Sequence, residues 1–131
     1  MTGTIVVAYT PDAFGEAALA TGVEEARLRG ADLLVVNGTR GDALVDESFA
    51  SREELADLRH RLAETGLATE VRQALAADVG DLVVEIARER DAALVVVGVR
   101  RRSPVGKLLM GSVSQRILLT ADCPVLAVKP D

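Results

Sequence analysis

The residue types best suited to binding chemistry gather in one segment, residues 98–114. In order, its glycines, cations and hydroxyl residues are Gly98, Arg100, Arg101, Arg102, Ser103, Gly106, Lys107, Gly111, Ser112 and Ser114. A helical pattern begins at Ser112, and a helix N-terminus offers unpaired N–H groups and the positive end of the helix dipole, which together bind anions. Glycine at 98 and 111 would let a phosphate reach the backbone without meeting a Cβ atom. The segment therefore predicts a phosphate-binding site.

The same segment also has a purely structural interpretation. Residues 112–115 have the spacing of a capping box, in which Ser112 would cap its own helix. Gly98 would then only end a strand, and the arginines would form a solvated basic turn. A P-loop is excluded, because Lys107 is followed by Leu108 where that motif requires Ser or Thr.

The remaining residues with catalytic potential are few and scattered. His60, the single histidine, lies between two arginines in a predicted helix, and we interpret it as a surface residue rather than a metal ligand. Cys123 is the single cysteine, so the chain has neither an internal disulfide nor a cysteine-based zinc site. Its place before Pro124 predicts a buried, unreactive thiol. No pair of carboxylates has obvious acid–base geometry, so we expect neither catalytic residues nor a metal site.

Apolar runs alternate with helical patterns along the chain, and this alternation predicts the elements that position the segment. Buried strands are predicted at residues 4–9, 33–36, 93–97 and 125–128, and an edge strand at 68–72. Helices are predicted at residues 14–29, 51–65, 79–90 and from about 112 onward, the second one beginning with a capping box at Ser51 and Glu54. This order predicts an α/β fold: a five-stranded parallel sheet with helices on both faces. If the winding reverses after the third strand, the strand order becomes 3-2-1-4-5.

A sheet with this strand order has a crevice at the carboxyl ends of its first and fourth strands, where ligands bind. Those ends correspond to residues 9–12 and 98–112. The connection 38–50 is longer than the usual length of about two to six residues between a strand and a helix. It would either fold over the crevice as a lid or form a solvated surface loop.

Composition restricts the class of protein. A chain of 131 residues with 49% apolar and 27% charged residues predicts one globular domain spanning residues 1–131. The net charge of −5 and an aromatic content of 2% argue against a general nucleic-acid binder. No apolar run approaches the roughly 18 residues of a membrane span, and the chain starts without a targeting signal. We therefore expect a soluble, cytoplasmic protein that binds neither nucleic acid in general nor a membrane.

The segment 98–112 resembles the nucleotide-binding motif of the universal stress protein family. That motif has a glycine, two residues, a second glycine, nine residues, and then a glycine followed by Ser or Thr. Gly98, Gly111 and Ser112 match its first glycine, third glycine and hydroxyl residue. The start of the first helix and the closing stretch 121–128, with its Cys-Pro pair, also fit the family. The resemblance covers essentially the whole chain, and it implies the α/β fold above and an adenine-nucleotide ligand, ATP with or without Mg²⁺.

The resemblance implies binding positions residue by residue. They are Ala8, Thr10, Gly38, Val97, Gly98, Arg101, Gly111, Ser112, Val113 and Ser114. Two of them depart from the family pattern. Arg101 replaces the second glycine, and Thr10 stands where the family has an acidic residue at the adenosine end, with Asp12 shortly after it. Arg101 either obstructs the triphosphate or, with the neighbouring cations, contacts the phosphates through its side chain.

The last strand, 125–128, is short, apolar and predicted at the sheet edge, where strands pair with other chains. The family resemblance implies a homodimer formed through this strand. Our leading hypothesis is a stress-responsive regulatory module that binds adenine nucleotide, ATP first, as a homodimer and hydrolyses it slowly at most. The alternative is a dimeric interaction protein with a degenerate site, which Arg101 and Thr10 favour. An enzyme that uses ATP for adenylation has only fold-level analogy behind it.

Overall fold

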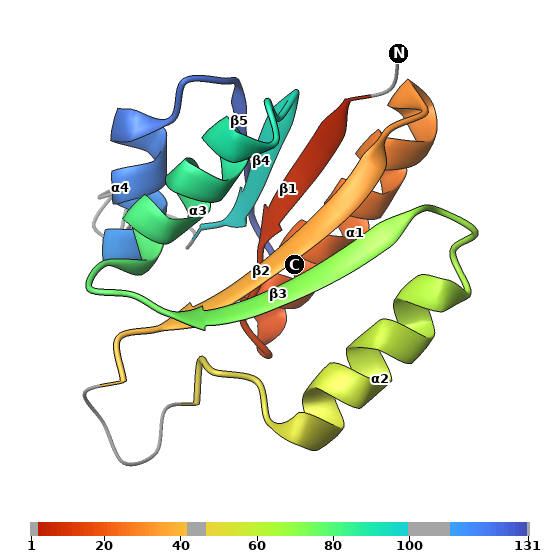
Figure 1. The fold of residues 1–131 in the computed structure, drawn as a ribbon, viewed down its shortest axis with the longest axis horizontal. Coiled ribbons are helices and arrows are strands. Elements are labelled where there is room, and N and C mark those ends of the chain that lie inside the picture. Colours follow the sequence, from red (N-terminus) through yellow and green to blue (C-terminus); the bar gives the residue numbers. More distant parts are fainter. Residues whose placement is uncertain (1–2, 42–46, 100–110, 131) are drawn as a thin grey trace.

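Strands and helices alternate along the described residues, 3–41, 47–99 and 111–130, of the computed structural model (Figure 1). The strands are β1 (Thr4–Ala8), β2 (Asp32–Thr39), β3 (Thr69–Leu75), β4 (Leu94–Gly98) and β5 (Val125–Val128). The helices are α1 (Ala13–Arg29), α2 (Arg52–Ala63), α3 (Val79–Glu89) and α4 (Ser112–Thr120). The predicted order of elements is confirmed, with boundaries shifted by a few residues.

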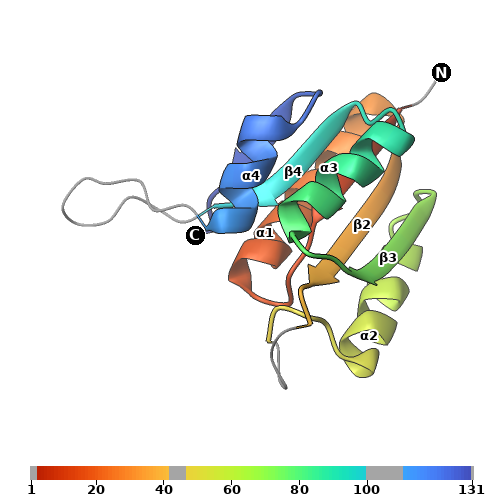
Figure 2. The ribbon, with the colours of Figure 1, turned by 60° about the vertical axis from the view of Figure 1, so that its left-hand side comes forward.

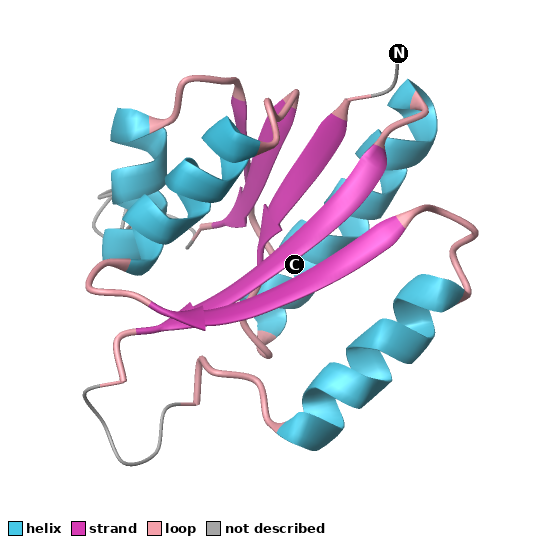
Figure 3. Ribbon diagram, viewed as in Figure 1, coloured by secondary structure: helices cyan, strands magenta, loops and turns pink. Residues whose placement is uncertain are grey.

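The strands form a parallel sheet in the order β3-β2-β1-β4-β5, as the sequence predicts (Figure 3). The winding reverses after β3, so that β4 pairs with β1 on the far side from β2. Ala8 at the end of β1 is in register with Val36 of β2 and with Val97 of β4. The carboxyl ends of these strands therefore lie together, and the loops that follow β1 and β4 diverge and leave a crevice.

Helices cover both faces of the sheet, as predicted. On one face, α1 and α2 pack on side chains such as Val7, with Leu58 of α2 in the same buried cluster. On the other face, α3 and α4 bring Val83 and Ile117 against Val6. Figures 1 and 2 show α3 and α4 side by side on that face. Successive residues of a strand point to opposite faces, which explains why the whole β1 run is apolar.

β2 is longer than its apolar run predicts. The strand continues past Val36, with Asn37 opposite Gln73 of β3 and Thr39 opposite Leu75. Asn and Gly disfavour strands, so local propensity indicates a turn at this point. The neighbouring strand supplies the pairing that propensity does not, and it thereby carries Asn37 into the interior of the protein.

The N-termini of α2 and α4 are capped differently. Ser51 Oγ accepts a hydrogen bond from the Glu54 N–H at 3.1 Å, and Glu54 Oε1 accepts one from the Ser51 N–H at 2.9 Å, which confirms the predicted capping box. The corresponding prediction for α4 is wrong. Gly111 is the N-cap residue, Ser112 is the first helical residue, and no side chain caps the helix. The first N–H groups of α4 therefore keep their capacity to bind another acceptor.

We expect Ser51→Ala to lower the free energy of unfolding by about 1 kcal/mol, because the first turn of α2 loses its cap. For a domain of this size, that change lowers Tm by several degrees. Ser112→Ala is the matched control: it removes the same side chain at the start of a helix where the side chain caps nothing, so Tm should not move. Thermal unfolding of the ligand-free protein, followed by circular dichroism, measures both. Equal losses in the two variants would contradict this assignment of the caps.

Candidate functional site

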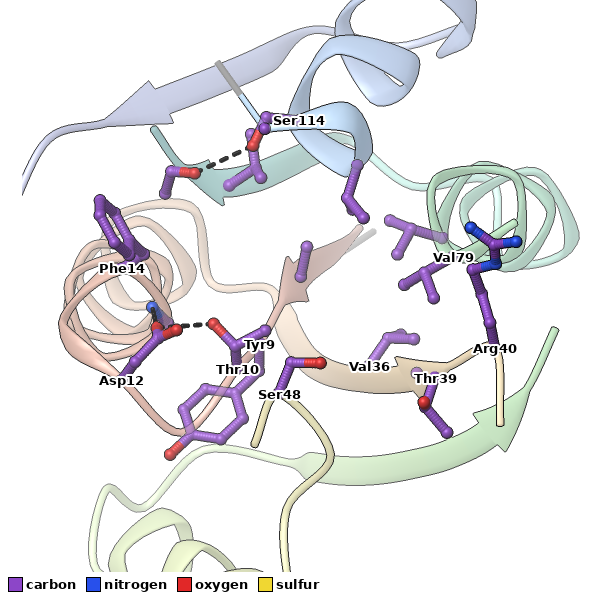
Figure 4. Close-up of a pocket in the computed structure, with 18 residues that line it drawn as sticks. Tyr9, Thr10, Asp12, Phe14, Val36, Thr39, Arg40, Ser48, Val79 and Ser114 are labelled. Carbon is purple, nitrogen blue, oxygen red and sulfur yellow. Dashed lines mark hydrogen bonds between the residues drawn. The ribbon is translucent and has the colours of Figure 1, made fainter. Parts of the chain in front are cut away.

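A cavity of about 350 Å³ lies at the carboxyl edge of the sheet, where β1, β2 and β4 end (Figure 4). The first turns of α1, α3 and α4 complete its walls. Its volume is within the range of small-molecule sites, and its lining combines an apolar majority with a few polar groups, as in such sites. The cavity occupies the crevice that the predicted strand order places there.

Most of the binding positions implied by the family resemblance line this cavity. They are Ala8, Thr10, Gly38, Val97, Gly98, Gly111, Val113 and Ser114. Ser112 is the exposed first residue of α4, and its side chain is not part of the lining. Arg101, the lysine at 107 and most of the predicted basic turn lie outside the described residues, as does the middle of the predicted lid.

Other lining residues were not among the predicted positions. They are Tyr9, Asp12, Phe14, Gly15, Val36, Thr39, Arg40, Ser48, Val79 and Val83. Tyr9 and Asp12 fall in the predicted crevice segment 9–12, and Thr39, Arg40 and Ser48 fall in the predicted connection 38–50. The first turns of the first and third helices were not predicted to reach the crevice. In a parallel sheet every helix that follows a strand begins at the carboxyl edge, so α1 and α3 open onto the same cavity as α4. That topological rule was the available signal.

The N-terminus of α4 is the part of the wall best suited to an anion. A Cβ atom added at Gly111 would meet no atom within 4 Å, so there is open space beside this residue. Ser114 Oγ donates a hydrogen bond to the Gly98 carbonyl oxygen at 3.1 Å, which commits the hydrogen of that hydroxyl. The donors that remain for a ligand are the backbone N–H groups of the first turn, which is where phosphates bind helices.

Gly98 has a different role from the one its motif position suggests. A Cβ atom there would lie 2.3 Å from the Phe14 carbonyl oxygen, so the start of α1 occupies the space beside it. Gly15, in the first turn of α1, is equally crowded: a Cβ atom there would lie 1.7 Å from the Thr10 carbonyl oxygen. The space at Gly98 is therefore filled by protein backbone, and a phosphate cannot use it. Glycine is needed at both positions for the close packing of α1 against the strand ends.

Asp12 brings a carboxylate to the wall of the cavity. It is the N-cap residue of α1, and its Oδ1 accepts hydrogen bonds from the Gly15 N–H at 3.0 Å and from Thr10 Oγ1 at 2.7 Å. Both bonds use one oxygen, which leaves Oδ2 as an acceptor. Asp12 and Arg40 are the charged residues among the described lining, and Figure 4 shows them on opposite sides of the cavity.

Tyr9 is a fixed part of the wall. Its hydroxyl donates to Glu16 Oε2 at 2.5 Å, and Arg61 of α2 donates to the same carboxylate at 2.7 and 3.1 Å. Hydrogen bonding from Arg61 holds the pKa of Glu16 below its usual value. Burial, reinforced by the Glu16 carboxylate, raises the pKa of Tyr9 well above its usual range. Tyr9 therefore remains protonated at neutral pH, so it contributes shape to the cavity rather than a proton acceptor.

The single histidine and the single cysteine lie away from the cavity. His60 is on the surface, as predicted, with its side chain 77% exposed and 3.5 Å from Glu64. Cys123 is half-buried rather than buried as predicted. Its partial burial still raises the pKa of the thiol, which is the direction expected for an unreactive cysteine. Within the described residues, His, Cys, Asp and Glu form no group of three or more that could hold a metal ion. None of the described helices is long and apolar enough to cross a bilayer.

An open parallel sheet with a cavity where the strand order reverses, and a helix N-terminus in the cavity wall, defines a doubly wound α/β fold with a candidate ligand cavity. Comparison with known proteins identifies the family within this fold class. The model of the universal stress protein family matches residues 1–129. The chain therefore belongs to the universal stress protein family.

Individual members of the family align with this chain over nearly its full length. A universal stress protein of Mycolicibacterium smegmatis is 48% identical over 126 residues, which cover 96% of this chain and 97% of that protein. The structure of a universal stress protein from Archaeoglobus fulgidus aligns with a TM-score of 0.79 at 30% identity, covering 98% of this chain and 99% of the other. A structure from the same organism, in complex with dAMP, aligns with a TM-score of 0.73 at 25% identity, covering 98% of each chain.

We expect Gly98→Ala and Gly111→Ala to separate the packing glycine from the open one. Gly98→Ala should lower the free energy of unfolding by about 1–3 kcal/mol, because backbone atoms of α1 have to move. Gly111→Ala should cause a smaller loss, set only by the weaker preference for alanine at an N-cap, because its φ of −67° suits alanine and the surrounding space is open. Urea unfolding of the ligand-free protein measures both values. A Gly111→Ala variant as unstable as Gly98→Ala would refute this division of roles.

Proposed function

We propose that this protein binds an adenine nucleotide in the cavity, with the phosphates at the N-terminus of α4. The observation that carries this proposal is the uncapped first turn of α4, which borders the cavity beside the open space at Gly111. Free N–H groups, the positive end of the helix dipole and room for a ligand coincide there. The Archaeoglobus fulgidus relative in complex with dAMP supports an adenine nucleotide as the ligand class.

The walls suggest how such a ligand would be held. The backbone N–H groups of Ser112, Val113 and Ser114 would bind phosphate oxygens, while the apolar wall at Ala8 and Val97 would pack against the base and sugar. Asp12 Oδ2 would accept a hydrogen bond from a ribose hydroxyl, replacing the acidic residue that the family pattern has at the Thr10 position. We expect ATP as the physiological nucleotide, with any Mg²⁺ bound mainly through the phosphates.

The same residues favour binding over catalysis. Asp12 is the carboxylate of the described lining, and it is engaged in capping α1. Burial and the hydrogen bond to Glu16 keep Tyr9 protonated. We therefore propose a stress-responsive regulatory module of the cytoplasm, formed by residues 1–131 as one domain, that hydrolyses ATP slowly at most.

A second candidate is a dimeric interaction protein whose nucleotide site is degenerate. It is favoured by Thr10 at the position of the family's acidic residue and by the engagement of Asp12 Oδ1 with its own helix. In this case the cavity would remain without nucleotide at cellular concentrations. Nucleotide binding by the purified protein decides between the two candidates.

We expect millimolar ATP or AMP to raise the Tm of the nucleotide-free protein by several degrees, because a ligand at about 100 times its Kd adds about 2.7 kcal/mol to the free energy of unfolding. Gly111→Val should abolish this shift, because its side chain would fill the space beside the α4 N–H groups. The ligand-free Tm of this variant should stay near that of the wild type, since no atom lies within 4 Å of the added Cβ. MgCl2 alone is the blank. The absence of a shift in the wild type would favour the second candidate.

We further propose that the protein forms a homodimer through β5. Val95 and Val99 of β4 donate hydrogen bonds to the carbonyl oxygens of Pro124 and Val128, so the alternate residue Ala127 directs its backbone N–H and C=O to the outer edge. Such an edge pairs readily with a second copy. At the opposite edge, charged β3 side chains form ion pairs with α3 and its C-cap: Arg72 with Glu89, and Glu70 with Arg90. Charged residues discourage pairing at an edge.

Ala127→Pro should convert the dimer to monomers, because proline removes one outward N–H and leaves the β4–β5 ladder intact. Ala127→Ser is the control, since it retains the N–H at similar size and should remain dimeric. Size-exclusion chromatography with light scattering measures the mass of each variant, and circular dichroism checks its fold. A folded Ala127→Pro dimer would place the interface elsewhere.

A further inference from the structure

Asn37 is a fully buried polar residue that lies next to the cavity but does not line it. Its Nδ2 donates hydrogen bonds to the carbonyl oxygens of Tyr9 and Ser48, both at 2.8 Å. Its Oδ1 accepts from the Ala50 N–H at 2.8 Å and from Gln73 Nε2 at 3.0 Å. Both hydrogens and both acceptor positions of the amide are therefore used, which is the full capacity of an asparagine side chain.

These bonds hold residues 48–50 as a neighbouring strand would. In a parallel ladder, one peptide group donates to the carbonyl before its partner residue and another accepts from the N–H after it. The Asn37 amide reproduces this pattern with the Ser48 carbonyl and the Ala50 N–H. Gln73 adds a further bond, from its Nε2 to the Ala50 carbonyl oxygen at 2.7 Å. Residues 48–50 are thus attached to β2 and β3 by two side-chain amides, those of Asn37 and Gln73.

The attached segment reaches the cavity through Ser48. Ser48 and Tyr9 both line it, and Figure 4 shows them on the same side, near Thr10. Asn37 bonds to the backbone of both residues, so one amide sets the spacing between the end of β1 and residues 48–50.

We propose that Asn37 is a positioning residue for ligand binding, supported by Gln73: it holds residues 48–50 in place, and with them Ser48 in the cavity wall, without touching the ligand. This role rests on the proposed function, because it concerns the same cavity. Asn37→Asp is the sharpest substitution, since the new carboxylate has the same shape and can still accept but cannot donate. It would face the carbonyl oxygens of Tyr9 and Ser48, and the segment would detach.

The test uses AMP affinity, measured by calorimetry, and hydrogen exchange of the Ala50 amide, measured by NMR. Asn37→Asp should weaken AMP binding about tenfold or more, equivalent to at least one buried hydrogen bond, and should speed Ala50 exchange. Gln73→Leu removes the supporting bonds and should produce a smaller change in both quantities. It also carries the test if Asn37→Asp does not fold. Ile86→Val, in the buried cluster on the other face, is the control for a general loss of stability.

A pH series gives a readout that loss of stability alone would not produce. Burial raises the pKa of a carboxylate, and its protonation restores one hydrogen-bond donor. As the pH is lowered, the Ala50 exchange rate and the AMP affinity of Asn37→Asp should therefore approach those of the wild type measured at the same pH. The role of Asn37 would be overturned if the Ala50 amide exchanged at the wild-type rate in Asn37→Asp. It would also be overturned if Ile86→Val lost as much AMP affinity as Asn37→Asp. If the wild type binds neither AMP nor ATP, the proposed function fails, and with it the ligand role of Asn37. Ala50 exchange then still decides whether Asn37 holds the segment.

Discussion

The parallel pairing of β1 with β4 is the contact on which the rest of the structure depends. It aligns Ala8 with Val97 and makes neighbours of two strands that lie far apart in the sequence. The chain has to reverse its winding to form this pair, and the loops after the two strands leave in opposite directions. Because all strands run parallel, α1, α3 and α4 begin at the same edge, and their first turns enclose one cavity.

Close packing at that edge explains why two glycines of one motif have different roles. The start of α1 approaches the end of β4 so closely that backbone atoms exclude a Cβ atom at Gly98. Gly111 borders open space at the N-terminus of α4 instead. The two glycines look alike in the sequence but have different roles. Gly98 permits the packing of α1, and Gly111 leaves room in the cavity.

Several polar residues around the cavity are held by hydrogen bonds within the protein. Asp12 caps α1 and orients Thr10, Ser114 is bonded to Gly98, and Asn37 joins β1 to residues 48–50. Groups fixed in this way lose little further freedom when a ligand binds, which is how preorganised sites gain affinity. The apolar core below the cavity supplies the rigid support for this arrangement.

Periodicity, capping spacing and the rules of parallel sheets are local or topological, so the order of elements and the cap of α2 could be predicted from the sequence. The family resemblance added fewer than half of the residues that line the cavity. The remaining features depend on contacts that form only when the chain packs. β2 extends through Asn37 because β3 pairs with it, and Gly98 is required because α1 lies against it. Ser114 bonds to β4 rather than joining a capping box. Each of these outcomes depends on a partner distant in sequence, and a distant contact outweighs a weak local preference once burial requires every polar group to find a bond.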